Sequence, residues 1–245
     1  MSPLEFVRVA TNLEEHMRGI RFSFGFIFIA LLIAGCRTAF MSVPAELAAT
    51  EAFAVTGANP RLWNRPLSFG PWRTSEVREG GRWGFAAPLL GLEAGFSQQP
   101  YRLVLEHEDG RAVQAECVAR SVTLSRSGWS VDPTLGALPA LACGFRSDDG
   151  DEWTLKLHAR GTNFEGELSS SSGSPLKIRS VHRLEGSRLP SGEPVGYEIA
   201  GDSPLAAVET VNRGRVWLAP SAGSSIDRRT AAAAAVLLLF EPADE

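Results

Sequence analysis

The chain has 245 residues and a formal net charge of −4. Its 24 basic residues are scattered along the sequence, which excludes the basic stripe that binds nucleic acid. This length is enough for one domain of moderate size or at most two small ones.

The first distinctive element is the apolar run from Phe22 to Gly35, fourteen residues without a charge. A membrane-spanning helix needs about 20 such residues, because each adds about 1.5 Å across a hydrocarbon core about 30 Å thick. The run is too short to span, but it matches the apolar region of a signal peptide, with Arg18 and Arg21 as the positive flank. We therefore expect residues 1–35 to be a signal peptide. Residues 1–16 hold three Glu residues, which are unusual in such a flank, so Met17 is an alternative start.

The end of this run, Leu32-Ile33-Ala34-Gly35-Cys36, resembles a bacterial lipobox. Over residues 17–36 the chain thus resembles a bacterial lipoprotein precursor. The resemblance implies cleavage after Gly35, diacylglycerol on the Cys36 thiol and an acyl chain such as palmitate on the new amino group. Arg37, in a place where Asp would signal retention in the inner membrane, implies an outer-membrane lipoprotein whose domain faces the periplasm. The expected partner is then the membrane, through the lipid anchor.

The next segment, residues 36–52, is rich in Ala, Ser, Thr and Glu after the cysteine, which predicts a tether. We expect a single mainly-β domain over residues 53–245. Its first part, from 60 to 100, holds Trp63, Trp72 and Trp83 among many Gly and Pro. This composition predicts short, twisted strands with tight corners and Trp side chains in the core.

Two hairpins are predicted next, because apolar residues alternate with polar ones. The first joins 101–108 to 111–119 through Asp109-Gly110, a dipeptide that favours a type I′ turn. The second joins 140–146 to 153–160 through the acidic segment 147–152. Further strands are predicted at 163–168, 176–184, 195–199, 205–211 and 215–219, with a surface loop at 169–174 and a turn at Asn212-Arg213-Gly214.

The last element, residues 224–240, begins with Ser and Asp, continues through five Ala and stops before Pro242. These signals predict a helix that packs on the sheet. The whole pattern predicts a mainly β fold, an antiparallel sandwich or a partly closed barrel with one C-terminal helix.

Two cysteines remain beside Cys36, namely Cys117 and Cys143. An even pair in an exported protein favours a disulfide, since the envelope is oxidising. The alternative is two buried free thiols. We expect no metal site, because the sequence has no CxxC or HxxxH spacing.

The candidates for catalysis are incomplete. Gly201-Asp202-Ser203 resembles the nucleophile block of GDSL-type esterases, but in that family a catalytic His follows near the end, whereas the last histidine here is His182. The other histidines, His107 and His158, lie on separate predicted strands. His182 shares a face with Leu176 and Ile178, which predicts a buried, hydrogen-bonded histidine. We therefore assign no catalytic residue and no cofactor, and an enzyme is not favoured.

Two other motifs concern ligand binding. The acidic cluster Asp148, Asp149, Asp151 and Glu152 lacks the order of an EF-hand loop, which predicts a solvated hairpin tip. Gly70-Pro71-Trp72 resembles the Gly-x-Trp of lipocalins, some of which are bacterial outer-membrane lipoproteins.

Two functional hypotheses of different classes follow. The first is a lipid-anchored, non-catalytic binding or assembly module of the envelope, with another envelope protein as its partner. The second is a lipocalin-like carrier of an apolar ligand, which requires an open cavity lined by Trp and Phe. A hydrolase is a third, less favoured reading, and it requires Ser203 or another Ser within hydrogen-bond reach of His182.

Overall fold

The computed structural model describes residues 39–57, 66–89, 92–126, 129–131, 138–171, 173–220 and 224–240. The predicted signal peptide, Met17, Cys36 and Trp63 lie outside these ranges. The chain divides into two compact units, Met1–Ala39 and Phe40–Glu245, and the second is described below. Its elements in chain order are α2 (Ala45–Ala48), β1 (Phe53–Ala54), β2 (Ser68–Phe69), β3 (Trp72–Glu79), β4 (Trp83–Leu89), β5 (Leu92–His107), β6 (Ala112–Arg126), β7 (Trp129–Val131), β8 (Leu141–Ser147), β9 (Glu152–Arg160), β10 (Asn163–Ser170), β11 (Gly173–Val181), β12 (Gly196–Ala200), β13 (Pro204–Glu209), β14 (Arg215–Leu218) and α3 (Ser224–Leu239).

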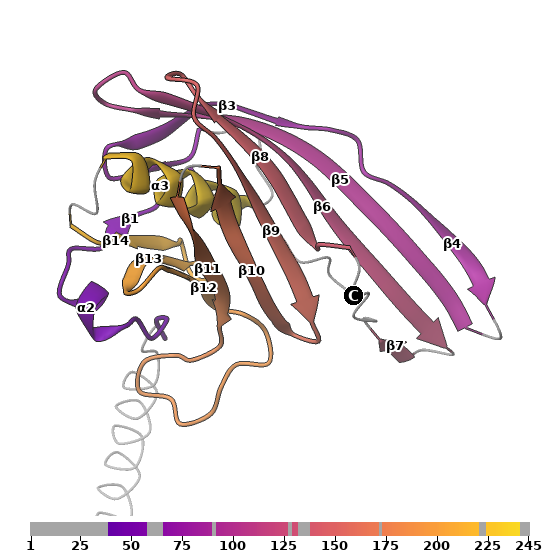
Figure 1. The fold of residues 1–245 in the computed structure, drawn as a ribbon. Coiled ribbons are helices and arrows are strands. Elements are labelled where there is room, and N and C mark those ends of the chain that lie inside the picture. The colour runs from indigo at the N-terminus through magenta and orange to yellow at the C-terminus, as the bar shows by residue number, and fades with distance from the viewer. Residues whose placement is uncertain are drawn as a thin grey trace, which may run out of the picture. The chain divides into compact units, whose positions relative to one another are not determined.

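The strands in the described ranges form one antiparallel sheet in the order β1-β14-β13-β12-β11-β10-β9-β8-β6-β5-β3-β2, with β4 beside β5 and β7 beside β6 (Figure 1). Most neighbours in the sheet are also neighbours in sequence, as in a meander. The two ends of this row meet, because the backbones of Thr56, just after β1, and Ser68 in β2 exchange two hydrogen bonds of 2.9 Å each. The fold is therefore a partly closed barrel with one C-terminal helix, which confirms the predicted class.

The alternation of side chains explains why these segments form strands with one buried face. In β9, Trp153, Leu155 and Leu157 are buried, while the residues between them face solvent. Across the sheet, Cys117 and its alternate neighbours on β6 are buried in the same way. Both predicted hairpins are confirmed at β5–β6 and β8–β9.

The hairpin turns differ from the predicted type I′ geometry. A type I′ turn needs positive φ at both central residues, but at Asp109-Gly110 only Gly110 has it, with φ of 91°. The His107 carbonyl accepts the Gly110 N–H at 2.9 Å, and the His107 N–H donates to the Arg111 carbonyl at 2.8 Å. This is the three-residue loop in which a type I turn is followed by a left-handed glycine. The β8–β9 turn repeats it with Gly150, whose φ is 89°.

The helix α3 occupies the inside of the curved sheet. The seven residues from Ala231 to Leu237 have no exposed surface, on any side of the helix. The helix contacts β6 as well as β13 and β14, which lie far apart in the sheet order, so the sheet curls around it (Figure 1). The Tyr101 hydroxyl, from β5, donates to the Val236 carbonyl at 3.3 Å. A helix that is apolar on every side is expected to be fully enclosed.

The segment predicted as a tether is instead packed on the domain from Phe40 onward. Met41 and Leu47 are almost completely buried, in a second cluster with Val195, Ala207 and Trp217. The segment forms an antiparallel β-bridge between Met41 and Leu184 and the short helix α2, although its composition suggested a tether. The two apolar side chains that dock it are too few to produce a periodic pattern.

Three smaller expectations also differ from the structure. Most of the predicted loop at 169–174 belongs to strands, since β10 runs to Ser170, which pairs with Gly173 at the start of β11. In the described part of the region from 60 to 100, β2 is short as predicted, but β3, β4 and β5 have 8, 7 and 16 residues. Trp72 is buried as expected, but the Trp83 side chain is exposed.

Candidate functional site

The barrel has two chemically different ends, because antiparallel strands place alternate turns at opposite edges. The Arg228 end carries the turns after β5, β8, β10 and β12, together with the first turns of α3. The Phe40 end carries the turns after β4, β9, β11 and β13, and the point where the chain enters the domain. In Figure 1 the tips of β4 and β7 and the β11–β12 loop lie on the lower side, and the β8–β9 turn lies at the top.

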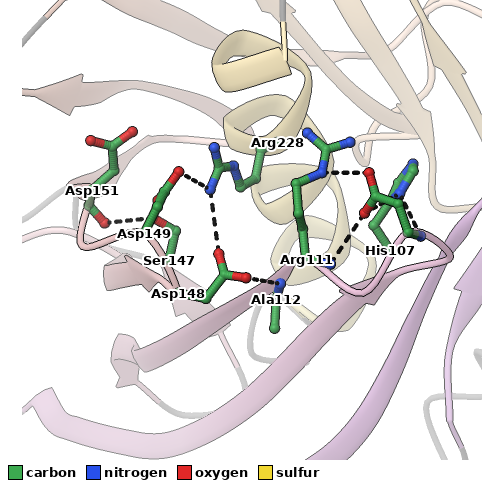
Figure 2. A network of polar contacts seen from close by, with 9 residues as sticks. His107, Arg111, Ala112, Ser147, Asp148, Asp149, Asp151 and Arg228 are labelled. Carbon is green, nitrogen blue, oxygen red and sulfur yellow. Dashed lines mark hydrogen bonds and ion pairs between the residues drawn. The ribbon is translucent and has the colours of Figure 1, made fainter.

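A polar network holds α3 at the Arg228 end (Figure 2). Arg228 is only 5% exposed, and its Nη1 lies 2.7 Å from Asp149 Oδ2 and 3.5 Å from Asp148 Oδ1. The Asp148 Oδ2 atom accepts the Ala112 N–H at 3.3 Å, and the Asp148 N–H donates to the Ala112 carbonyl at 3.2 Å. The network thus joins the helix to the β8–β9 turn and to the start of β6.

The contacts of this network lower the pKa of Asp149. The Ser147 hydroxyl donates to its Oδ1, and this bond, followed by the contacts with Arg228, lowers the pKa of Asp149 to about 2. The Ser147 hydroxyl also lies 3.2 Å from the Asp151 carbonyl. The carboxylates of Asp148 and Asp149 thus accept hydrogen bonds or ion pairs from the protein, whereas the sequence predicted a hairpin tip that contacts only solvent.

The neighbouring β5–β6 turn has its own ion pairs. Asp109 contacts His107 Nδ1 at 2.8 Å through Oδ1 and Arg111 Nε at 2.6 Å through Oδ2. Partial desolvation raises the pKa of Asp109, but hydrogen bonds from Arg111 and His107 outweigh it and hold that pKa below its usual value. The His107 ring packs against Trp72, with centroids 4.6 Å apart. The contacts of Asp109 and His107 indicate a structural role for this turn.

Within the described ranges, no group of three or more His, Cys, Asp or Glu side chains is placed to hold a metal ion.

At the Phe40 end, a buried carboxylate receives the entering chain. Glu209 has no exposed surface; its Oε1 accepts the Met41 N–H at 2.9 Å, and its Oε2 accepts Arg215 Nε at 2.6 Å. The Arg215 guanidinium also lies over the rings of Phe40 and Trp217, with its Cζ 3.9 and 4.7 Å from their centroids. Cation–π contacts and a charged hydrogen bond therefore fix the chain entry to β13 and β14.

The entering segment also pairs with the start of the β11–β12 loop, residues 182–195. The Ser42 N–H donates to the Arg183 carbonyl at 2.8 Å, and the Glu185 N–H donates to the Phe40 carbonyl at 2.7 Å. The loop is closed at its base by the Val195 N–H, which donates to the Val181 carbonyl at 2.8 Å. Loop and entry segment thus form one unit of the Phe40 end.

His182 fastens the inside of this loop. Its Nδ1 lies 3.2 Å from the Ser191 carbonyl, which can only accept, so Nδ1 carries the proton. Its Nε2 then accepts from the Ser180 hydroxyl at 3.1 Å, while Ser180 Oγ accepts the Phe164 N–H at 2.9 Å. His182 is half-buried just beyond β11, and Leu176 and Ile178 are buried as predicted.

Apolar side chains are exposed on the extension formed by β4 and β5. Trp83 and Phe85 of β4 pair with Gln98 and Phe96 of β5, and their rings lie 6.0 and 5.8 Å from the Phe96 ring. Trp83 is 53% exposed and Phe85 is 62% exposed. The residues that face inward on β5, such as Tyr101 and Leu103, have odd numbers, whereas Phe96 has an even number. Phe96 and the two rings beside it therefore lie on the outer face of the sheet.

The predicted disulfide is confirmed. Cys117 of β6 and Cys143 of β8 stand directly opposite each other in the ladder, with Cα atoms 4.1 Å apart and their sulfurs bonded. Both residues are buried in the main core. Cross-strand register thus brings together the two cysteines that the sequence paired only by counting.

The proposed esterase-like pair is not brought together. Ser203 is exposed in the β12–β13 turn at the Arg228 end, whereas His182 follows β11 at the Phe40 end. The serine within reach of His182 is Ser180, two residues away. The pairs that sequence reasoning missed, Arg228–Asp149 and Glu209–Met41, join residues 79 and 168 positions apart, so no local motif signals them.

Comparison with known proteins identifies no relative: no family model, curated protein or solved structure matches this chain. In the described ranges, no helix has both the length and the apolar character needed to cross a membrane.

Proposed function

We propose that this protein is a lipid-anchored, non-catalytic binding or assembly module of the bacterial cell envelope, held at the outer membrane by Cys36. The observation that carries the choice of module is the enclosed helix. Because α3 fills the inside of the barrel with seven fully buried residues, the surface offered to a partner is the outer one. The lipobox-like segment ending at Cys36 supports the anchor, and the Cys117–Cys143 bridge agrees with an oxidising compartment.

The lipocalin-like alternative needs space inside the barrel. The interior positions of β5, β6 and β9 pack in the same core cluster as Ala231–Leu237 of α3. A ligand inside would have to displace this helix and break the Tyr101–Val236 hydrogen bond. A fluorescent fatty-acid analogue should therefore show no saturable binding to the full chain; stoichiometric binding would favour the carrier.

One contact favours testing the hydrolase alternative, namely the Ser180–His182 hydrogen bond of 3.1 Å. A catalytic serine must be activated by a neighbouring base, and His182 is the base in reach of Ser180. Here, however, both His182 nitrogens hold backbone or side-chain partners that close the β11–β12 loop. A fluorophosphonate probe should leave the protein unlabelled. Labelling that disappears in Ser180→Ala but persists in Ser203→Ala would establish the hydrolase instead.

The anchor itself is tested by replacing the lipidated atom. Because diacylglycerol is attached through the Cys36 thiol, Cys36→Ser should accumulate as an unprocessed precursor without lipid label. The matched control is Ser42→Ala, close in sequence, which should be processed and labelled normally. Mass spectrometry of the mature N-terminus and labelling with radioactive palmitate provide the measurement. Normal processing and labelling of Cys36→Ser would refute the lipoprotein assignment.

A further inference from the structure

The exposed apolar side chains of this domain are concentrated toward one end. In the part of the chain that the structure describes, the large hydrophobic side chains left exposed are Trp83, Phe85, Leu138 and Leu189. Leu138 precedes β8 and Leu189 lies in the β11–β12 loop, both at the Phe40 end. β4 carries Trp83 and Phe85 and pairs with the N-terminal half of β5, which is the half nearer the Phe40 end. Figure 1 shows the tip of β4 on the lower side, where the β11–β12 loop also lies.

The Arg228 end has the opposite character. Its two hairpin turns carry Asp109 and Asp148–Asp149, paired with Arg111 and Arg228 (Figure 2). Single exposed apolar residues are ordinary on protein surfaces, but a segregation of all the large ones to one end is a sign of an interaction surface.

Leu189 is the most exposed of the four, at 77%, and its loop holds it outward in a fixed conformation. The Ser187 hydroxyl donates to the Leu189 carbonyl at 2.8 Å, and the Leu189 N–H lies 3.2 Å from the same hydroxyl oxygen. Two residues later, the Ser191 N–H donates to the His182 carbonyl at 2.6 Å. An apolar side chain presented by such a closed turn loses little further freedom when it binds.

The loop that presents Leu189 starts beside the chain entry. The Glu185 N–H donates to the Phe40 carbonyl, so these two residues are adjacent. Cys36 and Phe40 are four positions apart in the sequence, and so are Glu185 and Leu189. At no more than about 3.6 Å per residue, each of these connections spans at most about 14 Å. Cys36 and Leu189 are thus each connected to the Phe40–Glu185 pair by a segment of no more than about 14 Å.

We propose that the Phe40 end of the barrel faces the lipid bilayer and that Leu189 enters its interfacial layer. The inference rests on the proposed function, because the acyl chains on Cys36 are what bring the bilayer within reach of this end. The short connection favours a phospholipid surface over a protein partner, since it leaves little room for a third molecule between anchor and loop. The outer-face aromatic residues Trp83 and Phe85 lie toward the same side and match the amphipathic residues found at membrane interfaces.

The test uses the lipidated full chain in vesicles of phosphatidylethanolamine and phosphatidylglycerol. Leu189→Cys carries an environment-sensitive NBD dye at the Phe40 end, and Ser203→Cys carries it at the exposed β12–β13 turn as the matched control. The new thiol is the one labelled, since Cys117 and Cys143 are bridged and Cys36 is acylated. We expect a blue-shifted emission, and quenching by doxyl-labelled lipids, for the dye at position 189 and not for the dye at position 203.

The mass of the Cys36 peptide, measured on the same samples, separates the two proposals. If Cys36 is acylated and the dye at position 189 keeps its aqueous emission, the membrane-facing inference is overturned and the lipid anchor stands. If both dyes shift equally, the one-sided orientation is likewise overturned. If Cys36 is unmodified, its free thiol also takes the dye, so the position 189 variant is made again with Cys36→Ala. Entry of that dye into added vesicles means that the anchor fails and the lipid-binding surface stands.

Discussion

At the residue scale, the same turn position serves two different purposes. Asp109 and Asp149 each precede the left-handed glycine of a hairpin turn. Asp109 is satisfied locally by Arg111, two residues along the chain, whereas Asp149 pairs with Arg228, 79 residues away. The turn geometry and the Ser147 hydrogen bond, which lowers the pKa of Asp149 most, follow from local sequence, but the second donor, Arg228, comes from the packing of α3.

Asp149 should therefore shape the acid sensitivity of the protein. Its pKa in the folded state is lowered to about 2, whereas an unperturbed Asp has a pKa of about 3.9. The stabilisation is thus present above the unfolded-state pKa and is lost as the pH falls toward 2. We expect Asp149→Asn to lower the melting temperature at neutral pH and to flatten its decline between pH 4 and 2. Asp202→Asn, at an exposed turn, should retain the wild-type profile; a wild-type profile for Asp149→Asn would contradict the prediction.

Glu209 is the second residue on which stability should depend. Replacing it with Gln removes the charge that compensates Arg215, while the Arg215 side chain stays largely buried. A hydrogen bond to a charged group contributes about 1.5–3 kcal/mol, and Glu209→Gln should cost about that much in the free energy of unfolding. Glu152→Gln is the matched control, because Glu152 pairs with Arg146 on the exposed surface and such pairs contribute at most about 1 kcal/mol. Urea denaturation measures both, and equal losses would contradict the assignment.

At the element scale, the barrel wall is reinforced where it curves around the helix. β6 and β8 are adjacent in the sheet but separated in sequence by the segment that contains β7. The Cys117–Cys143 bridge closes this connection, with a sequence separation of 26 residues. It staples two strands that would otherwise depend on ladder hydrogen bonds and core packing.

Removing this bridge should be costly. A closed loop of this size removes unfolded-state entropy that corresponds to roughly 3 kcal/mol in the chain-entropy model. We expect the Cys117→Ala/Cys143→Ala variant to lose about that much stability in urea denaturation. Mass spectrometry with and without reductant should show a two-dalton difference in the native chain. Labelling of both thiols in unreduced, denatured protein would contradict the bridge.

At the scale of the whole molecule, α3 forms the centre of the core inside the barrel. The run from Ala231 to Ala235 is fully buried, and buried side chains in protein interiors are close-packed, so a larger side chain there has to displace its neighbours. Ala is the residue that lets helix and sheet approach this closely while keeping a high helix propensity.

Overpacking this run should strain the barrel. We expect Ala233→Leu to reduce the free energy of unfolding by about 1–3 kcal/mol, because the added methylene groups must displace neighbouring backbone or side chains. Ala48→Leu, in the exposed part of the short helix α2, is the matched control and should be nearly neutral. If Ala233→Leu is as stable as the control, α3 is less tightly enclosed than the structure indicates. Deleting residues 225–239 should go further and cause aggregation, since it uncovers the apolar strand faces.

The sequence by itself determined the local elements. Alternating residues such as Trp153, Leu155 and Leu157 predict strands with one buried face, the Asp-Gly pairs predict hairpins, and the Ala run predicts the C-terminal helix. These features depend on near neighbours along the chain, which is why their positions agree with the structure. The turn type was missed because Asp-Gly is compatible with more than one geometry.

Only the tertiary structure decided how the elements close on one another. Sequence patterns left open a sandwich or a barrel, because both bury the same alternate residues; the register that brings Thr56 to Ser68 distinguishes them. The enclosure of α3, the docking of Met41 on Glu209 and the segregation of exposed apolar residues to the Phe40 end join distant parts of the chain. Such contacts are set by how the whole sheet curves, and no local run of residues encodes that curvature.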